Sequence, residues 1–165
     1  MSIETILAIL DNLEKLHKSL LRIANEKTAL IKTGDIAGID QLLKDEQAHL
    51  AAIVQMDQDR QKAVIAYMKG QGRPVPMNPT ISNLIEITPE PDNKQLVEAK
   101  DRLLHAIQEL KWQNDLNQKM TYQSLQFVNL SLDMVRPRPE SATYTKTEIT
   151  GKKETKDIPT FDSQA

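Results

Sequence analysis

Two pairs of side chains in this sequence could bind a metal ion. Glu14 precedes His17 by three residues, and Glu46 precedes His49 by the same interval. On helices this spacing places a carboxylate and an imidazole on one face, as in carboxylate-bridged di-iron bundles. Such a site also needs single glutamates from two further long helices, and the chain provides only one. Because heptad spacing turns only His17 and Glu46 inward, we expect no metal and no cofactor.

Composition and motifs exclude several other kinds of chemistry. The 165 residues contain no cysteine, which excludes disulfides, thiol nucleophiles and cysteine-bound zinc. The sequence has no phosphate-binding loop, HExxH pair or nucleophile elbow. A formal charge of -2 offers no basic surface for nucleic acid, and no apolar run approaches the ~18 residues that span a bilayer. We therefore expect a non-enzymatic cytoplasmic protein that neither binds nucleic acid nor inserts into a membrane.

Proline positions divide the chain into blocks that can form helices. None of the eight prolines lies in residues 1–73 or 92–136, and five lie in residues 74–91. Because proline inside a helix removes a backbone hydrogen bond, the two proline-free blocks can form long helices. Apolar residues there recur in steps of three and four, the spacing of helices that pack lengthwise. These features predict helices at about 2–33, 36–69, 80–87 and 92–135.

The predicted fold is all-α, an elongated antiparallel bundle of three long helices plus one short connector helix. The first helix carries two overlapping apolar seams, which form a stripe wide enough to contact two neighbouring helices. Gly34 and Asp35 suit the end of one helix and the start of the next, which predicts a tight hairpin. We expect one domain over residues 1–135. Residues 136–165 are polar with only scattered apolar residues, which predicts a disordered tail that could fold on a partner.

Polar residues interrupt the apolar seams at matching positions of the predicted hairpin. In an antiparallel hairpin that turns at Gly34, the numbers of facing residues have a nearly constant sum. His17 with Asp57 and Lys27 with Glu46 meet this condition. We expect these pairs to set the register of the first two helices and to add little net stability, because desolvation offsets attraction.

The far end of the third long helix carries apolar residues on most sides of its axis. They follow a polar segment that includes Gln113, Asn114, Asn117 and Gln118, and one bundle face cannot bury them all. Three interpretations stay open: a partner's helices could dock there, a second copy could pack there in a homo-oligomeric coiled-coil scaffold, or the tail could fold back over it. The residues that we expect to contact a partner are Leu125, Phe127, Val128, Leu132 and Val135.

Several segments occur in an order that is typical of one known family. They are LHKSLL at 16–21, KTGD at 32–35, LLKDEQAHLAAI at 42–53, Arg60, and WQNDLNQKMTYQSLQFVNLSLDMV at 112–135. Together with the proline-broken connector and the polar tail, they resemble the FlgN family of flagellar export chaperones. The resemblance implies a small, cytoplasmic, all-helical chaperone, and we expect a monomer or weak dimer.

The resemblance also implies partners and roles for particular residues. The partners would be the hook-associated proteins FlgK and FlgL, whose terminal helices are kept from aggregating or assembling early. Delivery would be to the flagellar type III export apparatus, including the gate protein FlhA. Tyr144 stands where the family carries a tail tyrosine associated with gate docking, although Thr145 replaces the glycine that often follows. The resemblance thus assigns gate docking to Tyr144 and client binding to the apolar end of the third long helix.

Overall fold

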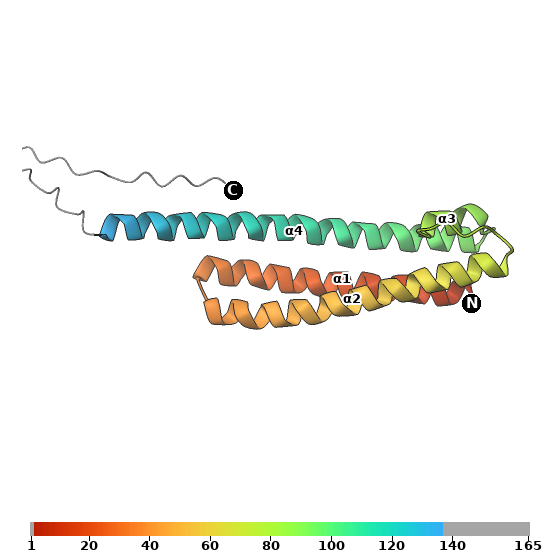
Figure 1. Cartoon of the computed structure of the whole chain (residues 1–165), viewed down its shortest axis with the longest axis horizontal. Coiled ribbons are helices and arrows are strands. Elements are labelled where there is room, and N and C mark those ends of the chain that lie inside the picture. Colours follow the sequence, from red (N-terminus) through yellow and green to blue (C-terminus); the bar gives the residue numbers. More distant parts are fainter. Residues whose placement is uncertain (1, 137–165) are drawn as a thin grey trace, which may run out of the picture.

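The computed structural model describes residues 2–136, which form four helices joined by short connections (Figure 1). They are α1 (Ile3–Thr33), α2 (Ile36–Gly70), α3 (Ile81–Ile87) and α4 (Asp92–Val135). The predicted all-α fold with three long helices and one short connector is confirmed, and each helix begins and ends within one residue of its expected position. None of these four helices is long and apolar enough to cross a membrane. Apart from Arg136, the predicted tail lies outside the described residues.

A glycine and an aspartate at the junction of α1 and α2 explain the hairpin. Gly34 has a φ of 70°, a left-handed conformation that glycine adopts at little cost, and its N–H donates to the carbonyl of Ile31 at 3.3 Å. The Asp35 carboxylate accepts a hydrogen bond from the N–H of Gly38 at 2.9 Å and so caps the first turn of α2. The tight hairpin that these residues predict is confirmed.

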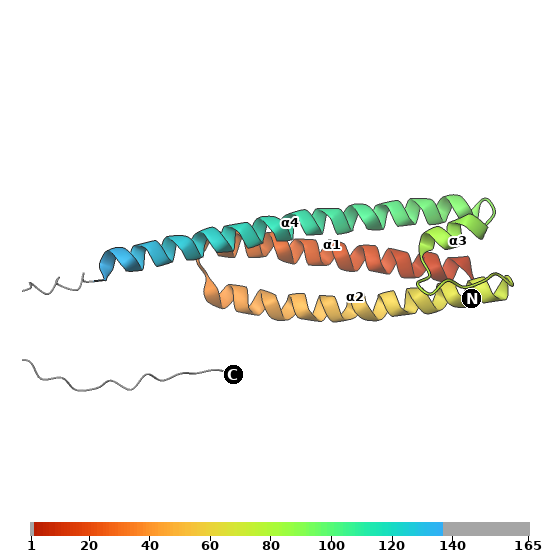
Figure 2. The same ribbon diagram turned by 45° about the horizontal axis from the view of Figure 1, so that its top comes forward.

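A capping box begins the short helix α3, and an asparagine attaches α3 to α4. The Thr80 hydroxyl accepts from the N–H of Asn83 at 3.2 Å, and the Asn83 side-chain oxygen accepts from the N–H of Thr80 at 3.0 Å. The Asn93 amide donates to the carbonyls of Ile85 at 2.7 Å and Thr88 at 3.2 Å. Since α3 also contacts α2, it closes this end of the bundle (Figure 2).

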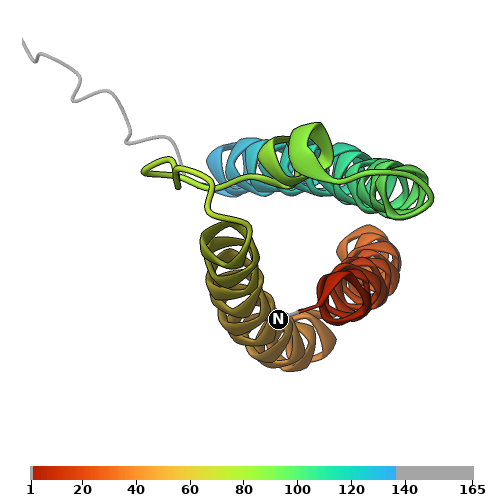
Figure 3. The ribbon, with the colours of Figure 1, turned by 90° about the vertical axis from the view of Figure 1, so that its right-hand side faces the viewer.

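The long helices are arranged around α1, which packs against both α2 and α4. α2 runs antiparallel to α1 and to α4, because the chain reverses at the hairpin and again near α3 (Figures 1 and 2). Within residues 2–136, no α-carbon of α2 lies within 8 Å of an α-carbon of α4, and the view along the bundle shows the two helices apart (Figure 3). The wide apolar stripe of α1 therefore contacts two neighbours, as its overlapping seams predict.

Buried apolar residues form two clusters along α1. The larger lies near α3 and draws on all four helices: Ile3, Ile6, Leu10, Ala63, Val64, Met68, Ile81, Leu84, Leu96 and Ala99. The smaller lies nearer the hairpin and draws its buried residues from α1 and α4: Leu20, Ile23, Ala24 and Leu110. All three buried residues of α2 lie in its last turns, so the hairpin half of α2 packs through partly buried side chains such as Leu42 and Ile53.

Leu10→Ala should lower the free energy of unfolding by about 2–5 kcal/mol, because Leu10 is 1% exposed and its truncation leaves a cavity in the larger cluster. Urea denaturation followed by circular dichroism measures the change. Leu50→Ala is the matched control, since Leu50 on α2 is 49% exposed and should lose about 1 kcal/mol or less. Equal losses in the two variants would contradict the central position of α1.

Candidate interaction surface

The C-terminal part of α4 extends beyond the hairpin of α1 and α2 (Figure 1). Among the described residues, the α1–α4 hydrogen bonds nearest the end of α4 join Thr28 to Gln113 and Asn117. From Thr121 to Val135 every residue is exposed except Ser131, which is partly exposed. We call residues 121–135 the α4 overhang.

The overhang presents a broad apolar surface to solvent. The five residues predicted to contact a partner are between 51% and 80% exposed: Leu125, Phe127, Val128, Leu132 and Val135. Tyr122, Leu130 and Met134 are exposed among them and were not on the predicted list of partner contacts. The expected exposure is confirmed, because α4 has no neighbouring helix here among the described residues. Contiguous exposed apolar surface of this kind is typical of interaction sites, and the role of the five residues stays a prediction.

A buried polar network attaches the base of the overhang to α1. The Gln113 amide donates to the Thr28 hydroxyl at 2.6 Å, and this hydroxyl donates to the Asn117 side-chain oxygen at 2.6 Å. The Asn117 amide donates to the carbonyl of Ala24 at 2.7 Å. Gln113 and Asn117 are buried, so this part of the polar segment belongs to the bundle core rather than to its surface. The overhang begins only after this network.

Glu14 lies buried between α1 and α4, which corrects the expectation that heptad spacing turns only His17 and Glu46 inward. Its two carboxylate oxygens lie 2.7 Å from Lys18 Nζ and 3.0 Å from Arg102 Nε, and Arg102 Nη2 lies 2.7 Å from Asp11 Oδ1. Hydrogen bonds from Lys18 and Arg102 hold the pKa of Glu14 below its ordinary value. Sequence reasoning missed Arg102 because only the alignment of α4 along α1 brings together residues 88 positions apart.

The two predicted polar pairs differ in their geometry. Lys27 Nζ donates to both carboxylate oxygens of Glu46, at 2.6 and 2.8 Å, and so joins α1 to α2. Among the described residues, His17 and Asp57 make no hydrogen bond or ion pair with one another. Instead, His17 bonds to a backbone carbonyl of its own helix at 2.7 Å, and Asp57 accepts from Arg60 at 2.7 Å. Each group of this second pair therefore finds a closer partner within its own helix.

The two Glu-x-x-His motifs do not converge on a common centre. His49 Nε2 lies 2.8 Å from Ser19 Oγ, and its Nδ1 lies 2.8 Å from the carbonyl oxygen of Asp45. The glutamates of both motifs are paired with cationic side chains. Across residues 2–136, no group of three or more histidine, aspartate and glutamate side chains is placed to hold a metal ion.

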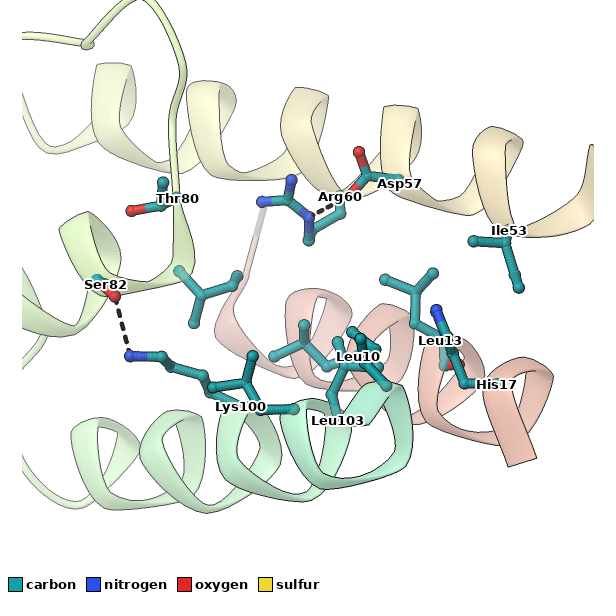
Figure 4. Close-up of a pocket in the computed structure, with 13 residues that line it drawn as sticks. Leu10, Leu13, His17, Ile53, Asp57, Arg60, Thr80, Ser82, Lys100 and Leu103 are labelled. Atoms are coloured by element: carbon teal, nitrogen blue, oxygen red, sulfur yellow. Dashed lines mark hydrogen bonds and ion pairs between the residues drawn. The ribbon is translucent and has the colours of Figure 1, made fainter. Parts of the chain in front are cut away.

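A groove of about 420 Å³ runs between α2 and α4, with α1 as its floor (Figure 4). Leu10 and Leu13 lie on the floor, and Leu104 and Ile107 line the α4 wall. Polar side chains gather at the end that α3 closes, where Lys100 Nζ donates to Ser82 Oγ at 3.0 Å. This groove exists because α2 and α4 both pack on α1 and not on one another, a detail that the seams of the separate helices do not reveal.

Comparison with known proteins gives one family and one full-length relative. The sequence model of the family described as "FlgN protein" matches residues 1–150 of the chain. The chain is also 31% identical over 165 residues to "Uncharacterized protein YvyG" of Bacillus subtilis (strain 168), and the alignment covers all of both chains. No solved structure matches the chain.

Glu14→Gln should lower the free energy of unfolding at pH 7 by about 1–2 kcal/mol, because it weakens two charge-assisted hydrogen bonds whose cationic partners are partly exposed. The pKa of Glu14 is depressed from about 4.5 in the folded chain, so its contribution is present above that pH. The contribution should be lost as the pH falls through the depressed folded pKa. The free energies of unfolding of the wild type and Glu14→Gln should therefore converge at low pH. Urea denaturation of the two proteins between pH 7 and pH 2 measures this.

Glu26→Gln is the control for this titration, because Glu26 forms an exposed pair with Arg22 on the same helix. It should change the free energy of unfolding by only about 0.5 kcal/mol at any pH. The free energies of unfolding of wild type and Glu14→Gln could instead differ by a constant amount down to pH 2. The ionised carboxylate of Glu14 would then not be the cause of the difference.

Proposed function

Because this chain belongs to the FlgN family of flagellar export chaperones, we propose that it binds the hook-filament junction proteins FlgK and FlgL before their export. The single observation that carries this proposal is the α4 overhang, an apolar helical segment that the described bundle leaves exposed. Partners with amphipathic helices can bury such a surface by packing helix against helix. The overhang is therefore the proposed client-binding surface.

The spacing of apolar residues on the overhang favours helical clients. Leu125, Val128, Leu132 and Val135 follow one another in steps of three and four, the pattern by which two helices pack lengthwise. Phe127 extends the apolar surface round the axis and is 71% exposed. The surface is thus wide enough for a client that offers more than one helix.

Binding at this surface has two consequences for the client. A covered terminal helix cannot aggregate or assemble early, because the side chains that would form those contacts are packed against the overhang. The complex then reaches the flagellar type III export apparatus, where Tyr144 docks on the gate protein FlhA. The chaperone acts in the cytoplasm as a monomer or weak dimer, without catalysing a reaction.

Val128→Asp should weaken binding of the C-terminal helical region of FlgK or FlgL by at least about 30-fold, equivalent to about 2 kcal/mol, because binding would bury an unpaired carboxylate. Calorimetric titration of the purified full-length protein measures the dissociation constant. The helical signal in circular dichroism should stay unchanged, since Val128 is 51% exposed in the free protein.

Gln126→Asp is the matched control, because it adds the same charge to the overhang on the side opposite Val128. It should bind FlgK or FlgL within about threefold of wild type. Wild-type protein that forms a stable dimer through Phe127 and binds neither client would contradict the chaperone proposal and favour a homo-oligomeric coiled-coil scaffold.

Tyr144→Ala should leave the affinity for FlgK unchanged and weaken capture of the chaperone–client complex by FlhA at least about tenfold, because it removes one aromatic anchor. Tyr144 lies outside the described residues, so this role rests on the family resemblance. Pull-down with the soluble domain of FlhA, with Thr145→Ala as the control, measures the loss. Equal capture of both variants would refute gate docking by Tyr144.

A further inference from the structure

The α4 wall of the groove carries apolar side chains that the bundle leaves partly exposed. Leu104 is 43% exposed and Ile107 is 37% exposed, and neither belongs to the two core clusters. On the opposite side, α2 contributes Ile53, which is partly exposed, together with the ion pair of Asp57 and Arg60. A helix lying between α2 and α4 could bury these side chains and complete a four-helix arrangement with α1.

The end of the groove beside α3 carries hydrogen-bond donors. Lys100 donates to the Ser82 hydroxyl and makes no ion pair with an acidic side chain in the part of the chain that the structure describes. Arg60 lies nearby, where it pairs with Asp57 and donates to the carbonyl of Pro79 at 3.4 Å (Figure 4). The last carbonyl groups of a helix lack intrahelical partners and carry a partial negative charge. This end of the groove therefore suits the carboxyl-terminal end of a helix.

The groove and the overhang lie on the same side of α4. Steps of four and three from Ile107 lead through Lys111, Asn114, Gln118 and Thr121 to Leu125, Val128, Leu132 and Val135. The stripe is thus apolar at both ends and polar in the middle. Ile107 and Leu125 are 18 residues apart, which corresponds to about 27 Å along a helix.

We propose that the client helix bound on the overhang continues along α4 and places its carboxyl-terminal end in the groove between α2 and α4. This inference rests on the proposed function and adds a second contact zone and a direction to it. The client helix runs antiparallel to α4, with its amino-terminal part on the overhang and its last turn near Lys100. From Leu104 to Val135 this path needs a helix of about 46 Å, or about 30 residues. Such a client carries two apolar segments separated by a polar one.

Ile107→Asp tests the second contact zone in the full-length protein. Titrated with the C-terminal helical region of FlgK, it should bind about tenfold more weakly than wild type, because the groove would have to bury a carboxylate. Gln108→Asp is the matched control, since Gln108 is exposed and lies beside Trp112, away from the groove. It should bind as wild type does. Circular dichroism and urea denaturation of each variant establish that the bundle is intact.

Disulfide trapping tests the direction of the client helix, because the chain has no cysteine of its own. Single-cysteine variants Ser82→Cys, at the closed end of the groove, and Asn129→Cys, on the overhang, are mixed with a client peptide whose last residue is a cysteine activated as a mixed disulfide with thionitrobenzoate, which leaves when the protein thiolate attacks. The peptide should form a disulfide with Ser82→Cys at least about tenfold faster than with Asn129→Cys. Faster trapping at Asn129→Cys would overturn the proposed direction.

Different binding results would overturn the groove contact and the proposed chaperone function. Val128→Asp could abolish client binding while Ile107→Asp leaves it unchanged. In that case the client does not contact the groove, and the proposed chaperone function still holds. No wild-type binding to FlgK or FlgL would overturn both. If a chain ending at Arg136 binds the client at least about tenfold more tightly than the full-length protein, and Ile107→Asp does not weaken that binding, the client does not use the groove and this inference is overturned. If a second copy of the chain occupied the groove, the wild-type protein would sediment as a dimer and Ile107→Asp as a monomer. That result would also overturn this inference.

Discussion

Packing of the apolar stripe of α1 against both α2 and α4 is the interaction on which the bundle depends. Ile6, Leu10 and Leu20 are almost completely buried, and each belongs to a cluster that includes residues of α4. α2 contributes buried side chains only near α3, and within the described residues it does not approach α4 closely. Because α1 holds both neighbours, the bundle stays open between α2 and α4, and the groove follows from this geometry.

A difference in helix length creates the other exposed surface. α4 has 44 residues and α1 has 31, and both begin near the end that α3 closes. The end of α4 therefore extends past the hairpin, where the described bundle provides no helix to bury its apolar side chains. Burial of these side chains on a partner can stabilise a complex without unfolding the chaperone, since the free bundle does not depend on them. The surface proposed to bind clients thus carries little of the stability of the fold.

Polar groups inside the bundle determine how α4 is aligned along α1. The Glu14–Arg102 ion pair and the Thr28–Asn117 hydrogen bond join the two helices at separate heights. Every buried side-chain nitrogen or oxygen atom in the described part of the chain has a hydrogen-bond partner, so a shift of one helix along the other would leave several unpaired. Each interaction adds modest net stability, and together they determine where the overhang begins and which side chains face the groove.

Local sequence determined the helices, the hairpin and the chemical character of the end of α4. Proline positions, apolar spacing and the Gly34–Asp35 junction are properties of neighbouring residues, and they predicted helix bounds to within one residue. The exposure of Val128 could also be predicted, because no single neighbour can bury apolar residues on every side of a helix. The burial of Glu14 against Arg102, the Gln113–Thr28 contact and the groove required the tertiary structure. These features join residues far apart in sequence, and they depend on the relative alignment of helices, which the periodicity of one helix does not specify.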